Sequence, residues 1–226
     1  LDNRILEKQV GAQSGLAHRI RRVLDETAAR NLLSKAYARA VEYRAALDDP
    51  ATHPTGNPSP EECQAVRDAL DRILECTFER LESDRKTFHI IYKPVNILPP
   101  DQYLAMVLQA TEGCSYNQCA FCSFYRDRKF YVKGVEEFDK HIRDVRAFFG
   151  GAIGLRKSIF LADANALIIP KPQLVTLFDA INHEFAIHPQ GLQDDALRTW
   201  QAQHPIHFEG VYSFIDAFTT RRKTAR

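Results

Sequence analysis

The chain has 226 residues, of which 45% are hydrophobic and 26% are charged, and its formal net charge is +1. This length allows one large or two small domains with a sizeable core, and the composition is ordinary for a soluble globular protein. The near-zero charge gives no overall field for nucleic acid, which leaves only a local patch to consider. No apolar run is long enough to cross a bilayer, and no signal peptide is visible. Because the sequence starts at Leu1 rather than at a methionine, we expect that the true N-terminus is missing.

The first hundred residues are predicted to be mostly helical. A short helix is expected over residues 3–10, ended by Gly11, and a long helix over residues 16–47, where apolar residues recur near helical spacing. Basic side chains decorate the long helix, and we interpret them as a solvated face rather than an RNA or DNA surface. They are Arg19, Arg21, Arg22, Arg30, Lys35, Arg39 and Arg44.

A Pro- and Gly-rich break at residues 48–60 is predicted to be a loop or hinge. Ser59 suits the N-cap and Pro60 the first position of the helix that follows, which runs to about Glu82. Two of the five cysteines fall on or near its apolar stripe, and we interpret them as small core residues rather than ligands. They are Cys63 and Cys76.

The second region, residues 101–226, alternates apolar runs with amphipathic segments. A short strand at 89–92 and an extended connector through 94–100 are expected to lead into it. Strand–helix–strand–helix–strand order predicts an α/β fold with a parallel sheet. The predicted strands are 103–110, 158–161 and 207–215, and the predicted helices are 133–149, ended by Gly150 and Gly151, and 172–183.

Three cysteines, Cys114, Cys119 and Cys122, follow the first of these strands in the pattern C-x4-C-x2-C. The carboxyl end of a parallel strand is where α/β barrels place reactive groups. Three thiolates can hold three irons of a 4Fe–4S cube and leave the fourth iron open. Structural zinc, buried thiols and a plant-type ferredoxin site are the alternatives. A closed zinc site requires a fourth ligand and the ferredoxin pattern a later cysteine, and no cysteine follows Cys122.

The cysteine segment resembles the cluster loop of the radical S-adenosylmethionine (radical SAM) superfamily. Phe121, just before the last cysteine, matches the aromatic of that motif, and the usual spacing, C-x3-C-x2-C, is one residue shorter than the spacing here. The wider phrase from Gly113 to Tyr125 is similar to an uncharacterised iron–sulfur oxidoreductase branch of the superfamily. Its aromatic residues are Tyr116, Phe121, Phe124 and Tyr125.

This resemblance implies a partial TIM-like (β/α) barrel, preceded here by the helical N-terminal region of residues 1–100. It also implies that the open iron binds S-adenosylmethionine (SAM), and that reductive cleavage gives methionine and a 5′-deoxyadenosyl radical. Only about three βα units fit between Cys114 and Arg226, whereas the family core has six. We expect the chain to be a fragment of a longer protein, and a protein that has lost half of its barrel is the alternative.

The resemblance also assigns provisional roles to residues at the strand ends. Phe121 would lie beside the adenine or the cluster. Asp163 stands where the family has a Gly-Gly-Glu-like turn that holds the amino group of SAM, and Asn165 lies beside it. Capping of the next segment is the alternative role for both residues. The third predicted strand ends with residues expected to face the same mouth, namely Tyr212, Ser213 and Asp216.

The implied enzyme would take electrons from an external donor of the flavodoxin or ferredoxin type and would need a reducing cytoplasm. Its substrate is not defined by the sequence. An electron-transfer iron–sulfur protein and a zinc-stabilised interaction module stay open as alternative functions. Four histidines lack a compact ligand spacing and are predicted to have surface or capping roles rather than to bind a second metal. They are His183, His188, His204 and His207.

Overall fold

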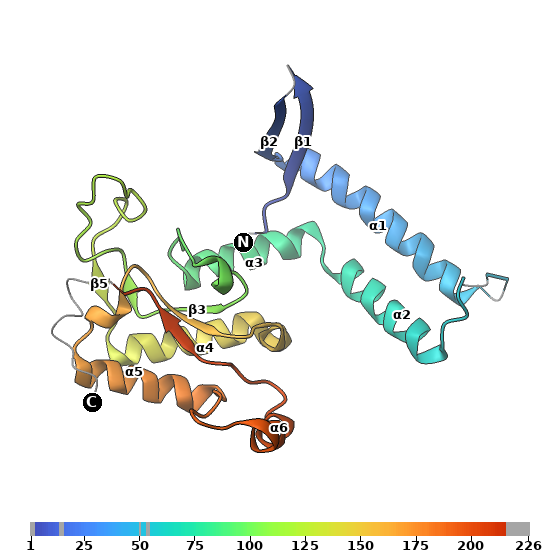
Figure 1. The fold of residues 1–226 in the computed structure, drawn as a ribbon. Helices are drawn as coiled ribbons and strands as arrows, with labels where there is room; N and C mark the ends of the chain where they lie inside the picture. Colours follow the sequence, from blue (N-terminus) through green and yellow to red (C-terminus); the bar gives the residue numbers. More distant parts are fainter. Residues whose placement is uncertain (1–2, 14–15, 50, 53–54, 216–226) are drawn as a thin grey trace. The chain divides into compact units, whose positions relative to one another are not determined.

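A computed structural model describes residues 3–13, 16–49, 51–52 and 55–215, without the side chains of residues 10–20 (Figure 1). The chain divides into two compact units, Leu1–His89 and Ile90–Arg226. Among the described residues, no helix has the length and apolar character needed to pass through a membrane. Asp216, which was expected to face the site, lies outside the described residues.

The first unit begins with a β-hairpin, not with helices. Strand β1 (Leu6–Gln13) pairs antiparallel with β2 (Leu16–Val23). The helix predicted over 3–10 and the first part of the helix predicted over 16–47 are therefore wrong. The spacing of Leu16 and Ile20 fits a period of two as well as a helical period, and the partner strand that decides between them is not visible in a local pattern.

Three helices follow the hairpin. Helix α1 (Glu26–Asp48) starts at Asp25, whose side chain accepts a hydrogen bond from the Ala28 amide at 2.9 Å. Helix α2 (Pro60–Glu75) starts in a capping box, as Ser59 and Pro60 predicted. The helix predicted to reach Glu82 is interrupted at Cys76, because Thr77 caps a new helix, α3 (Phe78–Ile91), through the Arg80 amide. The predicted strand at 89–92 is instead the end of α3.

Little of this unit is buried. The buried side chains of α1 are Ala29 and Ala40, and none of the described side chains of α2 or α3 is buried. Cys63 is half-buried and Cys76 is exposed at the end of α2, so the prediction that Cys76 is a core residue is wrong.

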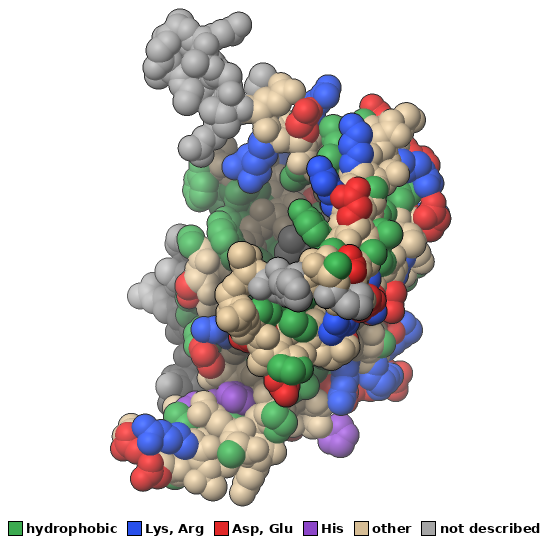
Figure 2. Space-filling model, turned by 90° about the vertical axis from the view of Figure 1, so that its right-hand side faces the viewer, with side chains coloured by type: hydrophobic (Ala, Val, Ile, Leu, Met, Phe, Trp, Pro, Cys, Tyr) green, Lys and Arg blue, Asp and Glu red, His purple; other side chains and the backbone are tan. Residues whose placement is uncertain are grey.

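The arginines of α1 are paired with acids. Arg30 contacts Glu26 and Glu79, and Arg44 contacts Asp48 and Asp71. Figure 2 shows positive and negative side chains mixed on the face it presents. The positive charges of these two arginines are thus largely compensated locally.

The second unit is built on a three-stranded parallel sheet in the order β3-β6-β7. The strands are β3 (Met106–Gln109), β6 (Ile159–Ala162) and β7 (Val211–Ser213), each shorter than or close to its predicted run. Helix α4 (Val135–Phe149) packs on β3, and α5 (Lys171–Glu184) packs beside α4 (Figure 1). The predicted α/β fold with a parallel sheet is confirmed, and the described residues contain no closed barrel.

The core of this unit lies between the sheet and these helices. Its central side chains have almost no exposed surface, and they are the apolar residues on which the strand and helix predictions were based. They include Met106, Leu108, Phe138, Ile142, Ile159, Leu161, Leu177 and Ile181. Phe160 instead packs on the other face of the sheet, in a small cluster with Ala105, Ala162 and Phe214.

Shorter elements complete the unit. Strand β4 (Thr111–Glu112) pairs antiparallel with β5 (Tyr131–Val132). Three 3-10 turns are η1 (Pro100–Gln102), η2 (Gly150–Leu155) and η3 (Ala166–Ile168). Helix α6 (Asp194–Gln203) was not predicted, and part of the run predicted as strand 207–215 makes a separate bridge between Phe208 and Ile187.

Candidate functional site

The three clustered cysteines lie on one loop at the carboxyl end of β3. We define the cysteine loop as residues 113–130, the segment between β4 and β5, whose pairing brings its two ends together. Cys114, Cys119 and Cys122 are half-buried free thiols. Because β3, β6 and β7 are parallel, the residues that follow β6 and β7 belong to the same edge of the sheet as this loop.

Backbone hydrogen bonds fold the cysteine loop onto itself. The Asn117 amide donates to Cys114 Sγ at 3.4 Å, and the Asn117 side chain donates to the Tyr125 carbonyl at 2.8 Å. Cys119 and Cys122 share a turn in which the Cys122 amide donates to the Cys119 carbonyl at 3.3 Å. Amide donation to a sulfur is an interaction that tunes iron–sulfur ligands.

Tyr125 is the buried aromatic residue of the cysteine loop. Its side chain is buried, and this burial raises the pKa of the phenol above its usual range. The charge of Asp163 raises the pKa further, the Arg128 guanidinium opposes the shift, and the thiols of Cys114 and Cys122 add to it.

The donor set of the loop fits a soft metal or an iron–sulfur cluster. All three candidate ligands are cysteines, whose thiolates such centres prefer, and none of the three forms a disulfide. As the described side chains stand, no three His, Cys, Asp or Glu residues are gathered closely enough to hold a metal ion. Loading of the site would thus require the thiols to turn toward one another.

Asp163 directly follows β6 and contacts Gly113, the first residue of the cysteine loop. Its Oδ2 accepts from the Gly113 amide at 3.0 Å, and its Oδ1 accepts from Gln109 Nε2 at 3.1 Å. The Asp163 amide donates to Thr111 Oγ1 at 2.9 Å. Burial raises the pKa of Asp163, while the two hydrogen bonds and the charge of Arg128 oppose that shift.

The other residues predicted to bind SAM have contacts of their own. Asn165 accepts from the Leu167 amide at 3.0 Å and caps η3, which is the capping role given above as an alternative. The Ser213 hydroxyl donates to the Leu161 carbonyl at 2.8 Å, within the sheet. Phe121 is 94% exposed on the cysteine loop.

Several polar residues near the ends of the cysteine loop were not predicted from the sequence to take part in the site. Gln109 and Thr111 are polar residues at 0% exposure, and this interruption of an apolar run was the available signal. Lys133 Nζ donates to Glu112 Oε1 at 2.6 Å, largely shielded from solvent. Arg128 carries the charge closest to Asp163, with 3.7 Å between Nη1 and Oδ2.

Three of the histidines gather around Trp200 instead of scattering. The ring of His204 stacks on Trp200 with centroids 4.3 Å apart, and His207 meets the indole edge at 5.4 Å. His188 lies 6.1 Å from it. Nδ1 of His204 bonds the Trp200 carbonyl at 2.8 Å at the end of α6, in agreement with the predicted capping role of that residue.

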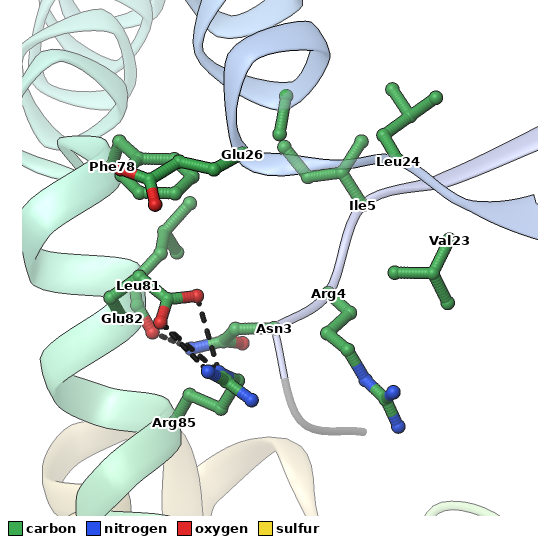
Figure 3. A pocket seen from close by; sticks show the side chains of 11 residues that line it. Asn3, Arg4, Ile5, Val23, Leu24, Glu26, Phe78, Leu81, Glu82 and Arg85 are labelled. Atoms are coloured by element: carbon green, nitrogen blue, oxygen red, sulfur yellow. Dashed lines mark hydrogen bonds and ion pairs between the residues drawn. The ribbon is translucent and has the colours of Figure 1, made fainter.

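A pocket and a groove lie outside the cysteine loop. The first unit has a pocket of about 200 Å³ between the hairpin base, the start of α1 and α3 (Figure 3). Its polar groups are engaged with protein partners: Asn3 donates to the Leu81 carbonyl, and Glu82 pairs with Arg85. The second unit has an open groove of about 600 Å³ lined by Arg146, Phe185 and neighbouring residues. Neither brings together a group of reactive side chains.

Comparisons with models of protein families, with curated proteins and with solved structures found no match. The interpretation of the cysteine loop therefore depends on the chemistry of its own residues.

Proposed function

We propose that the chain is part of a radical SAM enzyme whose cluster is held by Cys114, Cys119 and Cys122. One observation carries the proposal: three free thiols share a self-bonded loop at the carboxyl edge of a parallel sheet. The same unit contains no other cysteine, so its own thiols supply three ligands and not four. In this proposal β3, β6 and β7 begin a TIM-like barrel, and β7 is the edge at which further strands would add.

A 4Fe–4S cluster in such a site supplies an electron and an open iron position, where SAM binds and is reductively cleaved to a 5′-deoxyadenosyl radical that acts on the substrate. An external donor of the flavodoxin or ferredoxin type would supply that electron.

The chain's own residues have separate tasks in this proposal. The thiols bind the cluster, and the buried ring of Tyr125 keeps water from its inner side. Phe121 offers an exposed apolar ring to the cofactor. Asn165 and Ser213, at the same edge of the sheet, are the candidates for polar contacts to SAM.

The proposal is tested by anaerobic reconstitution of the full chain with iron and sulfide. We expect about four irons per chain and, after reduction with SAM present, formation of 5′-deoxyadenosine. The matched control is Cys63→Ala/Cys76→Ala, which removes two cysteines outside the loop and should bind iron normally. Cys114→Ala/Cys119→Ala/Cys122→Ala should bind none. One tightly held zinc and no visible absorption would instead identify a zinc module.

A further inference from the structure

The two ends of the cysteine loop contact the same buried side chain, that of Asp163. We define the loop neck as Gly113, Arg128 and Asp163. The side chain of Asp163 has no exposed surface, and each of its oxygens accepts a hydrogen bond, one from the Gly113 amide and one from Gln109. An oxygen acceptor in this position fixes the direction in which the chain leaves Gly113 toward Cys114.

The returning end of the loop packs against the same point. Gly113 has φ +78°, and a Cβ there would lie 3.1 Å from the Lys129 carbonyl oxygen and 3.2 Å from Arg128 Cγ. Any side chain at this position would be strained, both by the positive φ and by these close contacts. Arg128 is itself mostly buried and directs its guanidinium toward Asp163, so one carboxylate faces both ends of the loop.

We propose that Asp163 is a positioning residue for Cys114, acting through the Gly113 amide and through Arg128. Both carboxylate oxygens are engaged by protein donors and shielded from solvent, so the carboxylate holds the loop and does not meet a bound ligand. This role replaces the contact to the SAM amino group that the family resemblance implied. It concerns the geometry of the loop, and it rests on the proposed function only in that Cys114 is one of the proposed ligands.

The substitution Asp163→Asn tests this role because it changes which hydrogen bonds the side chain can accept. A carboxylate accepts on both oxygens, whereas an amide has one acceptor and one donor end. Gln109 cannot turn over to compensate, because its Oε1 accepts from the Lys93 amide at 2.9 Å and its Nε2 donates to the Lys93 carbonyl at 3.1 Å. The amide side chain of the variant would therefore lose one of the two bonds, and if its oxygen kept the Gly113 amide, that bond would be weaker because it would no longer be charge-assisted.

The test uses the full chain before any metal is added. Hydrogen exchange at the Gly113 amide is measured first in the natural sequence, where we expect protection well above that of exposed loop amides. In Asp163→Asn we expect exchange about tenfold faster. The matched control is Asp127→Asn, because Asp127 pairs with the same Arg128 but is exposed and does not contact Gly113.

Alkylation of single cysteines, followed by mass spectrometry, separates positioning from general loosening. Asp163→Asn should make Cys114 react faster relative to Cys119 and Cys122, while the half-buried Cys63 reports whether the first unit is intact and the exposed Cys76 gives the reference rate. An unprotected Gly113 amide in the natural sequence would overturn the inference without any variant. Unchanged exchange and unchanged Cys114 reactivity in a folded Asp163→Asn would also overturn it. Faster exchange in a chain that never binds iron would support the inference while contradicting the proposed function.

Discussion

His141 is a buried histidine whose protonation should affect the stability of the second unit. Its Nε2 accepts from the Gln109 amide at 3.0 Å, which requires the neutral ring. Burial, followed by the nearby charge of Lys133, lowers the pKa of His141 to about 4. Gln109 also donates to Asp163, so His141 is connected to Asp163 through this one residue by two hydrogen bonds.

We predict that His141 destabilises the second unit in acid. Its folded pKa lies below its unfolded value, so the folded state binds fewer protons, and its stabilising effect is present above the unfolded pKa of 6.5. That effect should be lost as the pH falls from 6.5 to about 4, by up to about 3 kcal/mol. Urea unfolding at several pH values, followed by Trp200 fluorescence, measures it.

His141→Gln, which keeps an acceptor without a titrating ring, is the control for this prediction. The difference in unfolding free energy between the two proteins should change across this pH range. Because Asp163, with its raised pKa, is present in both, its opposite contribution cancels. A difference independent of pH would contradict the assignment.

At the scale of elements, prediction succeeded where the signal was local. The buried strands β3 and β6 are continuous apolar runs, and α4 and α5 have clear apolar stripes. The hairpin was predicted as helices because each of its strands depends on pairing with the other, and a local sequence pattern does not show that pairing. Helix α6 was missed because it is short and has no buried described residue that would mark an apolar face.

The N-cap of α2 gives a test at this scale. Ser59 Oγ accepts from the Glu62 amide at 3.2 Å, and Glu62 accepts from the Ser59 amide at 2.7 Å. Because α2 has no buried described side chain, its ends matter more than its packing. Ser59→Ala should destabilise α2 by about 1 kcal/mol, seen as faster amide exchange in its first turns.

Ser83→Ala is the matched control, because Ser83 is an exposed residue inside α3. Alanine there should leave exchange in α2 unchanged and slightly favour α3. Equal effects of the two substitutions on α2 would show that the cap contributes nothing.

At the scale of the molecule, burial is concentrated in the second unit. Leu161, in β6, has no exposed surface, whereas Leu155 is 74% exposed. Leu161→Ala should lower the free energy of unfolding of this unit by about 3 kcal/mol, and Leu155→Ala should change it little. Trp200, the single tryptophan, reports unfolding of this unit in both variants. Comparable losses would contradict the assignment of the core.

The candidate site could be predicted only in outline. Cys114, Cys119 and Cys122 stood out because their spacing is local, and their place after β3 followed from the order of elements. The loop neck could not be found in this way, because Asp163 and Gly113 meet only after β6 pairs with β3. The sheet holds three strands within the described residues, so a complete barrel remains part of the proposal.

The central claim is that the cluster has one iron without a protein ligand. Electron paramagnetic resonance of the anaerobically reconstituted, reduced chain tests it most directly when spectra are recorded with and without SAM. The account predicts a 4Fe–4S signal that shifts when SAM is added. An intact 4Fe–4S signal that SAM leaves unchanged at saturating concentration would contradict it.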